Sequence, residues 1–264
     1  MADERPIPND TNKRETADTK GDQEPVIKIE HLKKSFGSKE VLKDASMVLH
    51  EGENLVVLGR SGQGKSVAIK CIAGLLQQDE GTCNVYGQEV KDLSETELRE
   101  LRKKIGFLFQ SAALYDSMTV GENLAFPLTR VLKMTDESEI QKLVEEMLDN
   151  VGLKEAIDKM PSDLSGGMRK RIGLARTLIM KPQIMLYDEP TTGLDTITSK
   201  EISQLILDMQ KKYKTSSIII THDMLCAKIT SDRMLVLNDG SFIAEGTYDE
   251  LENSDNELVR SFFK

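Results

Sequence analysis

A glycine-rich loop is the first candidate for chemistry in this sequence. The octapeptide GRSGQGKS at 59–66 fits the spacing G-x-x-x-x-G-K-[ST], and it lies between an apolar run and a helical pattern. Gly62 and Gly64 allow successive backbone N–H groups to point inward, where the dipole of the following helix also favours an anion. Lys65 would then reach the β- and γ-phosphates of a nucleotide, and the Ser66 hydroxyl would hold Mg²⁺. The alternative is a flexible corner with a surface lysine. A dinucleotide-binding loop is excluded, because no G-x-G-x-x-G can be laid over these residues.

Two neighbouring carboxylates follow a second apolar run, IMLYD at 184–188. A phosphate-binding loop needs a carboxylate at the end of a neighbouring buried strand, to hold the metal from its far side. Asp188 would orient Mg²⁺, and Glu189 would polarise a hydrolytic water. Two acids at a solvated strand end are the alternative interpretation.

Gln110 and His222 also follow apolar runs, IGFLF and SSIIIT. Carboxyl ends of parallel strands meet at one edge, which is where doubly wound folds bind ligands. A single Gln or His in such a place is more often structural. Their common edge makes both residues candidates for sensing a γ-phosphate.

A second anion site is indicated by DLSGGMRKR at 163–171. Ser165, Gly166 and Gly167 open a strong helical pattern and would offer a hydroxyl, backbone N–H groups and a helix dipole. A plain helix N-cap followed by a basic face explains the composition equally well.

The elements that must position these residues follow an α/β pattern. Apolar runs without polar alternation indicate strands buried on both faces, and their alternation with helical patterns indicates a parallel sheet. The runs lie at 54–58, 105–109, 184–188 and 216–221, and the helical patterns at 67–76, 139–153, 166–180 and 199–213. The alternating segments VIKIEHL and ASMVLH predict a half-exposed antiparallel layer. Residues 111–163 predict a separate helical lobe, and no internal repeat is present, so one catalytic module is expected.

Composition excludes several classes of protein. A formal net charge of -9 disfavours nucleic acid or an anionic membrane surface as the main partner. No stretch approaches the roughly 20 apolar residues that span a bilayer, and the first residues lack the apolar core of a signal peptide, so we expect a cytosolic chain. Cys71, Cys83 and Cys226 form no CxxC pair and are expected to be reduced thiols. Residues 1–25 are rich in charge and proline and predict a disordered tail.

Taken together, the motifs resemble those of the ATPase subunits of ABC transporters. The six motifs, in the family's order, are GRSGQGKS as the Walker A loop, Gln110 as the Q-loop residue, LSGGM as the signature, IMLYDEP as Walker B, GLD at 193–195 as the D-loop and His222 as the switch histidine. The resemblance covers about residues 26–264. This sequence departs from the family at Met168, where the family usually has Gln.

The resemblance implies a P-loop (RecA-like) parallel-sheet core with an antiparallel β subdomain and an α-helical subdomain, the last at about 111–163. It also implies catalytic roles for Glu189, as the base, and for His222 and Gln110, with Mg²⁺ held by Ser66, Gln110 and Asp188. Phe36 in KKSFG is similar to the family's adenine-stacking aromatic, although a packing aromatic is the alternative. The residues implied to bind ATP are Phe36, Gly59, Ser61, Gly62, Gly64, Lys65, Ser66, Val67, Ser165, Gly166, Gly167 and Asp195.

The partners implied by the resemblance are a second copy of the chain and an integral-membrane permease, with no nucleic acid. Two subunits would close head to tail around two ATP molecules, each between one Walker A loop and the other chain's LSGGM, on the cytoplasmic face of the inner membrane. Three segments look most like those of the ATPases of Mla-type, MCE-associated phospholipid transporters: LSGGMRKR, DEPTTGLDTITS and the final ELENSDNELVRSFFK. This likeness implies an MCE lipid-binding subunit as a further partner. An importer of another small solute and a regulatory ABC ATPase are the alternatives; a DNA-repair or translation ABC protein is disfavoured, since no second cassette is present.

A C-terminal docking segment is expected at about 246–264. Leu258 with Phe262, and Val259 with Phe263, have i,i+4 spacing and would form an apolar face. Docking on the sister subunit and docking on the chain's own domain are both compatible with the pattern.

Overall fold

The computed structural model describes residues 25–263, so the expected tail at 1–25 falls almost entirely outside the described residues. Ten described strands form one mixed sheet in the order β5-β4-β1-β2-β10-β9-β3-β8-β7-β6. The strands are β1 Ile27–Phe36, β2 Lys39–Leu49, β3 Asn54–Leu58, β4 Glu80–Val85, β5 Gln88–Glu89, β6 Ile105–Leu108, β7 Ile184–Asp188, β8 Ser216–Thr221, β9 Arg233–Asn238 and β10 Ser241–Gly246.

The sheet has a parallel part and an antiparallel part. Five neighbouring strands run parallel to one another: β9, β3, β8, β7 and β6. The other part contains antiparallel pairs of β1, β2, β4 and β5. Strand β10 joins the two parts: it pairs antiparallel with β9 and meets β2 through Ser241 opposite Asp44. The predicted parallel core with an antiparallel β layer is confirmed.

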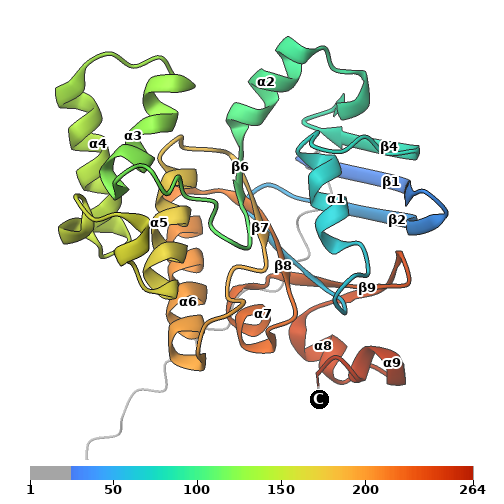
Figure 1. Cartoon of the computed structure of the whole chain (residues 1–264). Helices are drawn as coiled ribbons and strands as arrows, with labels where there is room; N and C mark the ends of the chain where they lie inside the picture. The colour runs from blue at the N-terminus through green and yellow to red at the C-terminus, as the bar shows by residue number, and fades with distance from the viewer. Residues whose placement is uncertain (1–24, 264) are drawn as a thin grey trace, which may run out of the picture.

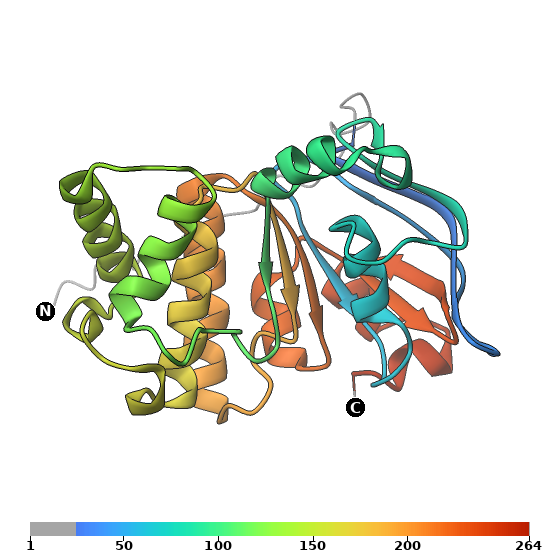
Figure 2. The ribbon, with the colours of Figure 1, turned by 45° about the horizontal axis from the view of Figure 1, so that its top comes forward.

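The described residues contain nine α-helices. They are α1 Lys65–Ile72, α2 Glu95–Lys104, α3 Val120–Arg130, α4 Glu137–Asn150, α5 Gly166–Leu178, α6 Thr196–Tyr213, α7 Met224–Thr230, α8 Tyr248–Glu252 and α9 Glu257–Arg260. Figures 1 and 2 show α3, α4, α5 and α6 on one side of strands β6–β8, with α1, β1, β2 and β4 on the other. Of the described helices, none combines the length and the apolar character that a membrane crossing requires.

Strand β3 shows why the apolar runs are unbroken. Side chains of a strand alternate between its two faces. Leu55 and Val57 pack in the hydrophobic core on the α1 side, whereas Val56 and Leu58 pack in the core on the side of the helical lobe. Because both faces are covered, no position of this strand tolerates a solvated side chain.

The C-terminal segment packs on its own chain. Val259 and Leu251 are buried in the core on the side of the helical lobe, and the ring of Phe263 lies edge to face with Tyr248 at 5.2 Å between centroids. Leu258, which precedes Val259 in the short helix α9, is exposed. The two i,i+4 pairs therefore do not form one continuous face.

Candidate functional site

A pocket of about 500 Å³ opens at the carboxyl ends of strands β3, β7 and β8. These strands are neighbours and parallel, so the residues that follow them meet at one edge. The pocket is lined by Val41, Arg60, Ser61, Gly62, Gly64, Lys65, Ser66, Val67, Gln110, Glu189 and His222. The loop 59–66 and three side chains expected from other strand ends are thus brought together.

Glycine is required at two positions of the loop by close backbone approach. A Cβ at Gly59 would lie 2.7 Å from the carbonyl oxygen of Leu237. A Cβ at Gly64 would lie 2.8 Å from the carbonyl oxygen of Val41, and Gly64 also has a φ of +102°, which side chains disfavour. The loop is therefore held tightly between β2 and β9, directly before helix α1.

Lys65 directs its ammonium group into the loop. The side chain is only 6% exposed. Nζ donates to the carbonyl oxygens of Gly59 at 2.6 Å and Arg60 at 3.2 Å, and it lies 3.5 Å from Oε1 of Glu189. A buried cation among inward-facing loop groups fits a bound anion such as a phosphate.

Ser66 and Asp188 form a pair of oxygen donors beside this cation. The Ser66 hydroxyl donates to Oδ1 of Asp188 at 2.7 Å, and Asp188 is buried at the end of β7. Gln110 contributes an amide to the same pocket. Hydroxyl, carboxylate and amide oxygens are the ligands that Mg²⁺ prefers, so the residues fit this ion.

Glu189 lies between two other functional groups. Its Oε2 is 2.7 Å from Nδ1 of His222 and accepts a hydrogen bond from Oγ1 of Thr192 at 3.2 Å. The Glu189 backbone has a φ of +52°, and its N–H donates to the carbonyl oxygen of Ile220 at 2.9 Å. A positive φ is disfavoured for a side-chain-bearing residue and persists only where the surroundings hold it. A carboxylate and an imidazole in contact can accept and hold a proton from water.

Lys170 was missed by the sequence analysis. This residue of α5 is buried, and its Nζ donates to the carbonyl oxygens of Gln110 at 2.5 Å and Glu189 at 3.2 Å. Burial lowers the pKa of the Lys170 ammonium, while the charges of Glu189 and Asp188 act in the opposite direction. The sequence showed only a basic helical face, RKR, and gave no signal that one of its cations points inward.

The residues of the second expected anion site lie together but outside the pocket. Ser165 caps α5 by accepting from the N–H of Met168 at 3.2 Å, and Asp195 caps α6 in the same way. A Cβ at Gly167 would lie 2.6 Å from Cγ2 of Thr198, which shows how closely the two helix starts approach. Ser165 and Gly166 are exposed, so this surface is free to meet another molecule.

Phe36 and Met168 are not among the residues that line the pocket. Phe36, expected to stack on adenine, ends β1 with 48% of its surface exposed and is not among the pocket-lining residues; the Lys34 ammonium lies 5.6 Å from its ring centroid. Met168 is half-buried and packs against the hydrophobic core.

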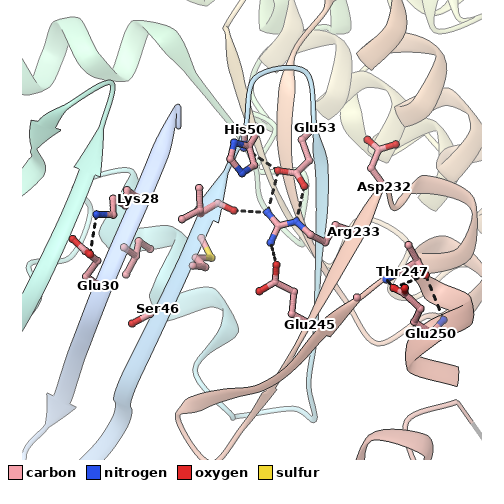
Figure 3. Close-up of a pocket in the computed structure, with 14 residues that line it drawn as sticks. Lys28, Glu30, Ser46, His50, Glu53, Asp232, Arg233, Glu245, Thr247 and Glu250 are labelled. Carbon is pink, nitrogen blue, oxygen red and sulfur yellow. Dashed lines mark hydrogen bonds and ion pairs between the residues drawn. The ribbon is translucent and has the colours of Figure 1, made fainter. Parts of the chain in front are cut away.

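A second pocket, of about 970 Å³, lies between β1, β2, β9 and β10 (Figure 3). Its central guanidinium, Arg233, bonds to Glu53, to Glu245 and to the carbonyl oxygen of Val48. Burial raises the pKa of Glu53, but hydrogen bonds from Arg233 and from the His50 N–H outweigh it and hold that pKa below its usual value. These charges pair with one another, and the network connects the antiparallel layer to β9.

A protein-family model described as "ABC transporter" matches residues 42–192, which include the loop at 59–66, Ser165 and Glu189. The chain belongs to the ABC transporter family. It is an ATP-binding cassette protein and an ATPase. This ABC ATPase is 41% identical over 237 residues to the "Probable ribonucleotide transport ATP-binding protein mkl" of Mycobacterium leprae, covering 90% of the chain and 68% of that relative. The chain thus spans about two thirds of the length of this relative.

Other relatives carry different names. "Protein TRIGALACTOSYLDIACYLGLYCEROL 3, chloroplastic" of Arabidopsis thaliana is 40% identical over 258 residues, covering 91% of the chain and 74% of that protein. The "Methionine import ATP-binding protein MetN" of Campylobacter jejuni is 37% identical over 252 residues, covering 90% of the chain and 75% of the relative. The ABC ATPase is therefore similar to proteins whose names refer to three unlike compounds: a ribonucleotide, a galactosylated diacylglycerol and methionine.

Solved structures of the same fold support the nucleotide site. The cassette MJ0796, in a dimeric post-hydrolysis state bound to ADP and Pi, has a TM-score of 0.76 and 31% identity, covering 84% of this chain and 98% of that one. The protein cbiO1 of Clostridium perfringens is described as part of the transporter complex cbiONQ. It has a TM-score of 0.80 and 30% identity, and the match covers 90% of this chain and 94% of that one. This ABC ATPase accordingly binds ATP and ADP.

Proposed function

We propose that this ABC ATPase works as a head-to-tail homodimer that closes around two ATP molecules. The observation that supports the proposal is the separation of the two anion-binding groups within one chain. Lys65 and Ser66 line the pocket, whereas Ser165 and Gly166 are exposed on another surface, next to the buried Gly167. A second copy would bring its Ser165 surface to the nucleotide bound by the first. A relative of similar fold is described as a dimer bound to ADP and Pi.

In the proposed site, Lys65 and the N–H groups of the loop hold the β- and γ-phosphates. Mg²⁺, when held by Ser66, Gln110 and Asp188, neutralises phosphate charge. Glu189 accepts a proton from the attacking water, and His222, 2.7 Å away, orients the carboxylate and senses the γ-phosphate. Phe36 stacks on the adenine from the antiparallel layer, and Asp195 keeps the start of α6 in place against the other subunit.

A docking groove for a permease lies between the helical lobe and β6. A pocket of about 250 Å³ there is lined by Tyr115, Phe126, Arg176 and their neighbours. Tyr115 and Phe126 contact each other at 4.8 Å between ring centroids, and the Arg176 guanidinium lies 5.2 Å from the Tyr115 ring. Tyr115 and Val131, which both line it, remain exposed. Such an aromatic groove with a basic edge suits a short amphipathic helix of a permease at the cytoplasmic face of the inner membrane.

We propose phospholipid as the transported solute, with an MCE lipid-binding subunit in the same complex. The support is the likeness of LSGGMRKR and DEPTTGLDTITS to Mla-type ATPases, together with 40% identity to a relative named after a galactosyl diacylglycerol. The names of other relatives refer to ribonucleotide and methionine, so import of another small solute is the second candidate.

Purification of the tagged chain from membranes, followed by identification of its partners, tests this assignment. A permease together with a lipid-binding MCE subunit is the expected result, and the purified complex should hydrolyse ATP faster when phospholipid is added. A permease that copurifies with a soluble solute-binding protein instead would contradict the lipid assignment.

A tagged Tyr115→Ser/Phe126→Ser variant tests the proposed groove. If this variant recovers as much permease as the wild type, the groove is not the docking site.

A further inference from the structure

One face of α5 lies directly on the segment that follows β6. Lys170, Gly173 and Thr177 have i, i+3 and i+7 spacing, which places them on the same side of the helix. A Cβ at Gly173 would lie 2.7 Å from Cβ of Ala112 and 3.1 Å from Cδ1 of Leu108. A Cβ at Gly106 would lie 2.7 Å from Cγ2 of Thr177. No side chain larger than hydrogen fits at Gly173, so the helix approaches Gln110 closely enough for Lys170 to reach it.

The ammonium of Lys170 joins backbone carbonyl groups that follow two neighbouring strands of the site. It bonds to the backbone of Gln110, at the end of β6, and to the backbone of Glu189, at the end of β7. These are the residues whose side chains are proposed to bind Mg²⁺ and to activate water. The Glu189 backbone is in a disfavoured left-handed conformation, which persists only where its surroundings hold it.

We propose that Lys170 is a positioning residue for ATP hydrolysis: from the signature helix it fixes the backbone of Gln110 and Glu189, and so the directions of their side chains. This inference rests on the catalytic roles proposed above. Helix α5 then serves two sites. Its N-terminal Ser165 faces the nucleotide of the partner subunit, whereas Lys170, between one and two turns later, sets the geometry of the chain's own Glu189.

The test is a comparison of steady-state hydrolysis and equilibrium ATP binding in the full-length protein. Lys170→Met keeps the length of the side chain but donates no hydrogen bond. Because small misplacements of catalytic groups are costly, kcat should fall on the order of 10- to 100-fold. The Kd for ATP should change by less than about twofold, because the phosphate-binding loop is not touched. Lys170→Gln keeps amide donors on a shorter chain and should lower kcat only about threefold.

Arg171 provides a matched control on the same helix. It donates to the carbonyl oxygen of Val151 and to Glu201, away from the pocket. Arg171→Met should therefore lower thermal stability without changing kcat by more than about twofold. If Arg171→Met and Lys170→Met lower kcat equally, Lys170 has only a structural role and the inference is wrong.

Dimer closure separates the two functions of α5. In a Glu189→Gln background, adding Lys170→Met should leave ATP-driven dimerisation intact, as seen by size-exclusion chromatography. Loss of that dimer would mean that Lys170 acts through the Ser165 end of α5 and would overturn the inference.

If Lys170→Met does not fold, the measurement is made on Lys170→Gln. A lower kcat with an unchanged Kd for ATP supports the positioning role, and an unchanged kcat or a changed Kd contradicts it. A wild-type chain without ATP hydrolysis would contradict the proposed catalytic roles themselves.

Discussion

Nδ1 of His222 lies 2.7 Å from Oε2 of Glu189, while the other oxygen of the same carboxylate lies 3.5 Å from the Lys65 ammonium. The carboxylate therefore contacts both groups that are proposed to meet the γ-phosphate. A phosphate entering the loop competes with Glu189 for Lys65, and this competition would release one carboxylate oxygen toward water. If Glu189 is the base proposed above, the contact would keep its carboxylate paired before nucleotide binds and free it to accept a proton afterwards.

Glu189→Gln should remove most hydrolysis while ATP binding persists. A general base contributes about 10² to 10⁴ in rate, and the amide cannot accept the proton of water. ATP-bound dimer should accumulate, which size-exclusion chromatography with ATP can detect. Near-normal turnover in this variant would rule out Glu189 as the base.

Lys65→Ala should abolish nucleotide binding itself. The variant loses the buried ammonium that lies among the loop carbonyls, and Kd measured by calorimetry should rise by at least about tenfold, or about 1.4 kcal/mol. Lys70→Ala, on the same helix α1 but outside the pocket-lining set, is the control and should bind ATP normally. Unchanged affinity in Lys65→Ala would mean that the loop is not the phosphate site.

Ser165→Arg should bind ATP but hydrolyse little of it, because the bulky cation would face the partner's nucleotide. The change also removes a helix cap, which costs about 1 kcal/mol. Ser165→Asp keeps a capping side chain and adds negative charge against phosphate, so it should show the same loss of activity without the loss of stability. Wild-type hydrolysis by both variants would refute the two-subunit site.

Arg233→Met should destabilise the fold most at neutral pH. The variant leaves the buried Glu53 carboxylate without its partner, a change that typically costs about 3–5 kcal/mol. In the wild type the pKa of Glu53 is held low, so its contribution to stability is present above about pH 4.3 and is lost as pH falls through the folded pKa. In the variant the folded pKa rises, so protonation relieves the penalty, and the difference between the two proteins in free energy of unfolding should narrow as pH falls from about 6 to 4.

Urea unfolding at a series of pH values measures this effect. Glu53→Gln/Arg233→Met serves as the control, because it removes the buried charge together with its partner and should show a smaller loss at neutral pH. A difference between wild type and Arg233→Met that stays constant with pH would show that Glu53 is not the group responsible.

The parallel core was predictable because its strands are buried on both faces. Strands β3, β7 and β8 consist of buried residues throughout. Their sequences therefore do not alternate between apolar and polar residues, and they are recognised as unbroken apolar runs. Strand β9 is equally apolar at its centre, but no chemical motif follows it, and it was not predicted. Helix α2 was missed because Leu98 and Leu101 are the only apolar residues of ETELRELRKK, and only Leu101 is buried. An amphipathic pattern is weak where so little of a helix is covered.

The pocket residues at strand ends followed from topology, since parallel strands bring their carboxyl ends together. The position of Lys170 did not, because its burial depends on how closely α5 approaches residues 110–112, and that distance is set by Gly173 in tertiary contact. The local pattern of a basic helix face is the same whether a lysine points to solvent or inward. The distances from Lys170 to two backbone carbonyls are visible only once β6 and β7 are placed beside α5.

The near contact of Gly173 with Ala112, and of Gly106 with Thr177, also limits how these sequences can drift over time. A Cβ at Gly173 would meet the Cβ of Ala112 at 2.7 Å, so a larger residue at position 173 requires glycine at position 112 or a shifted helix. Among descendants of this gene, a side chain at position 173 should accordingly appear only together with glycine at position 112, and one at position 106 only together with smaller residues at both 177 and 185, whereas exposed positions of the same helix, such as Arg169, are free to vary alone.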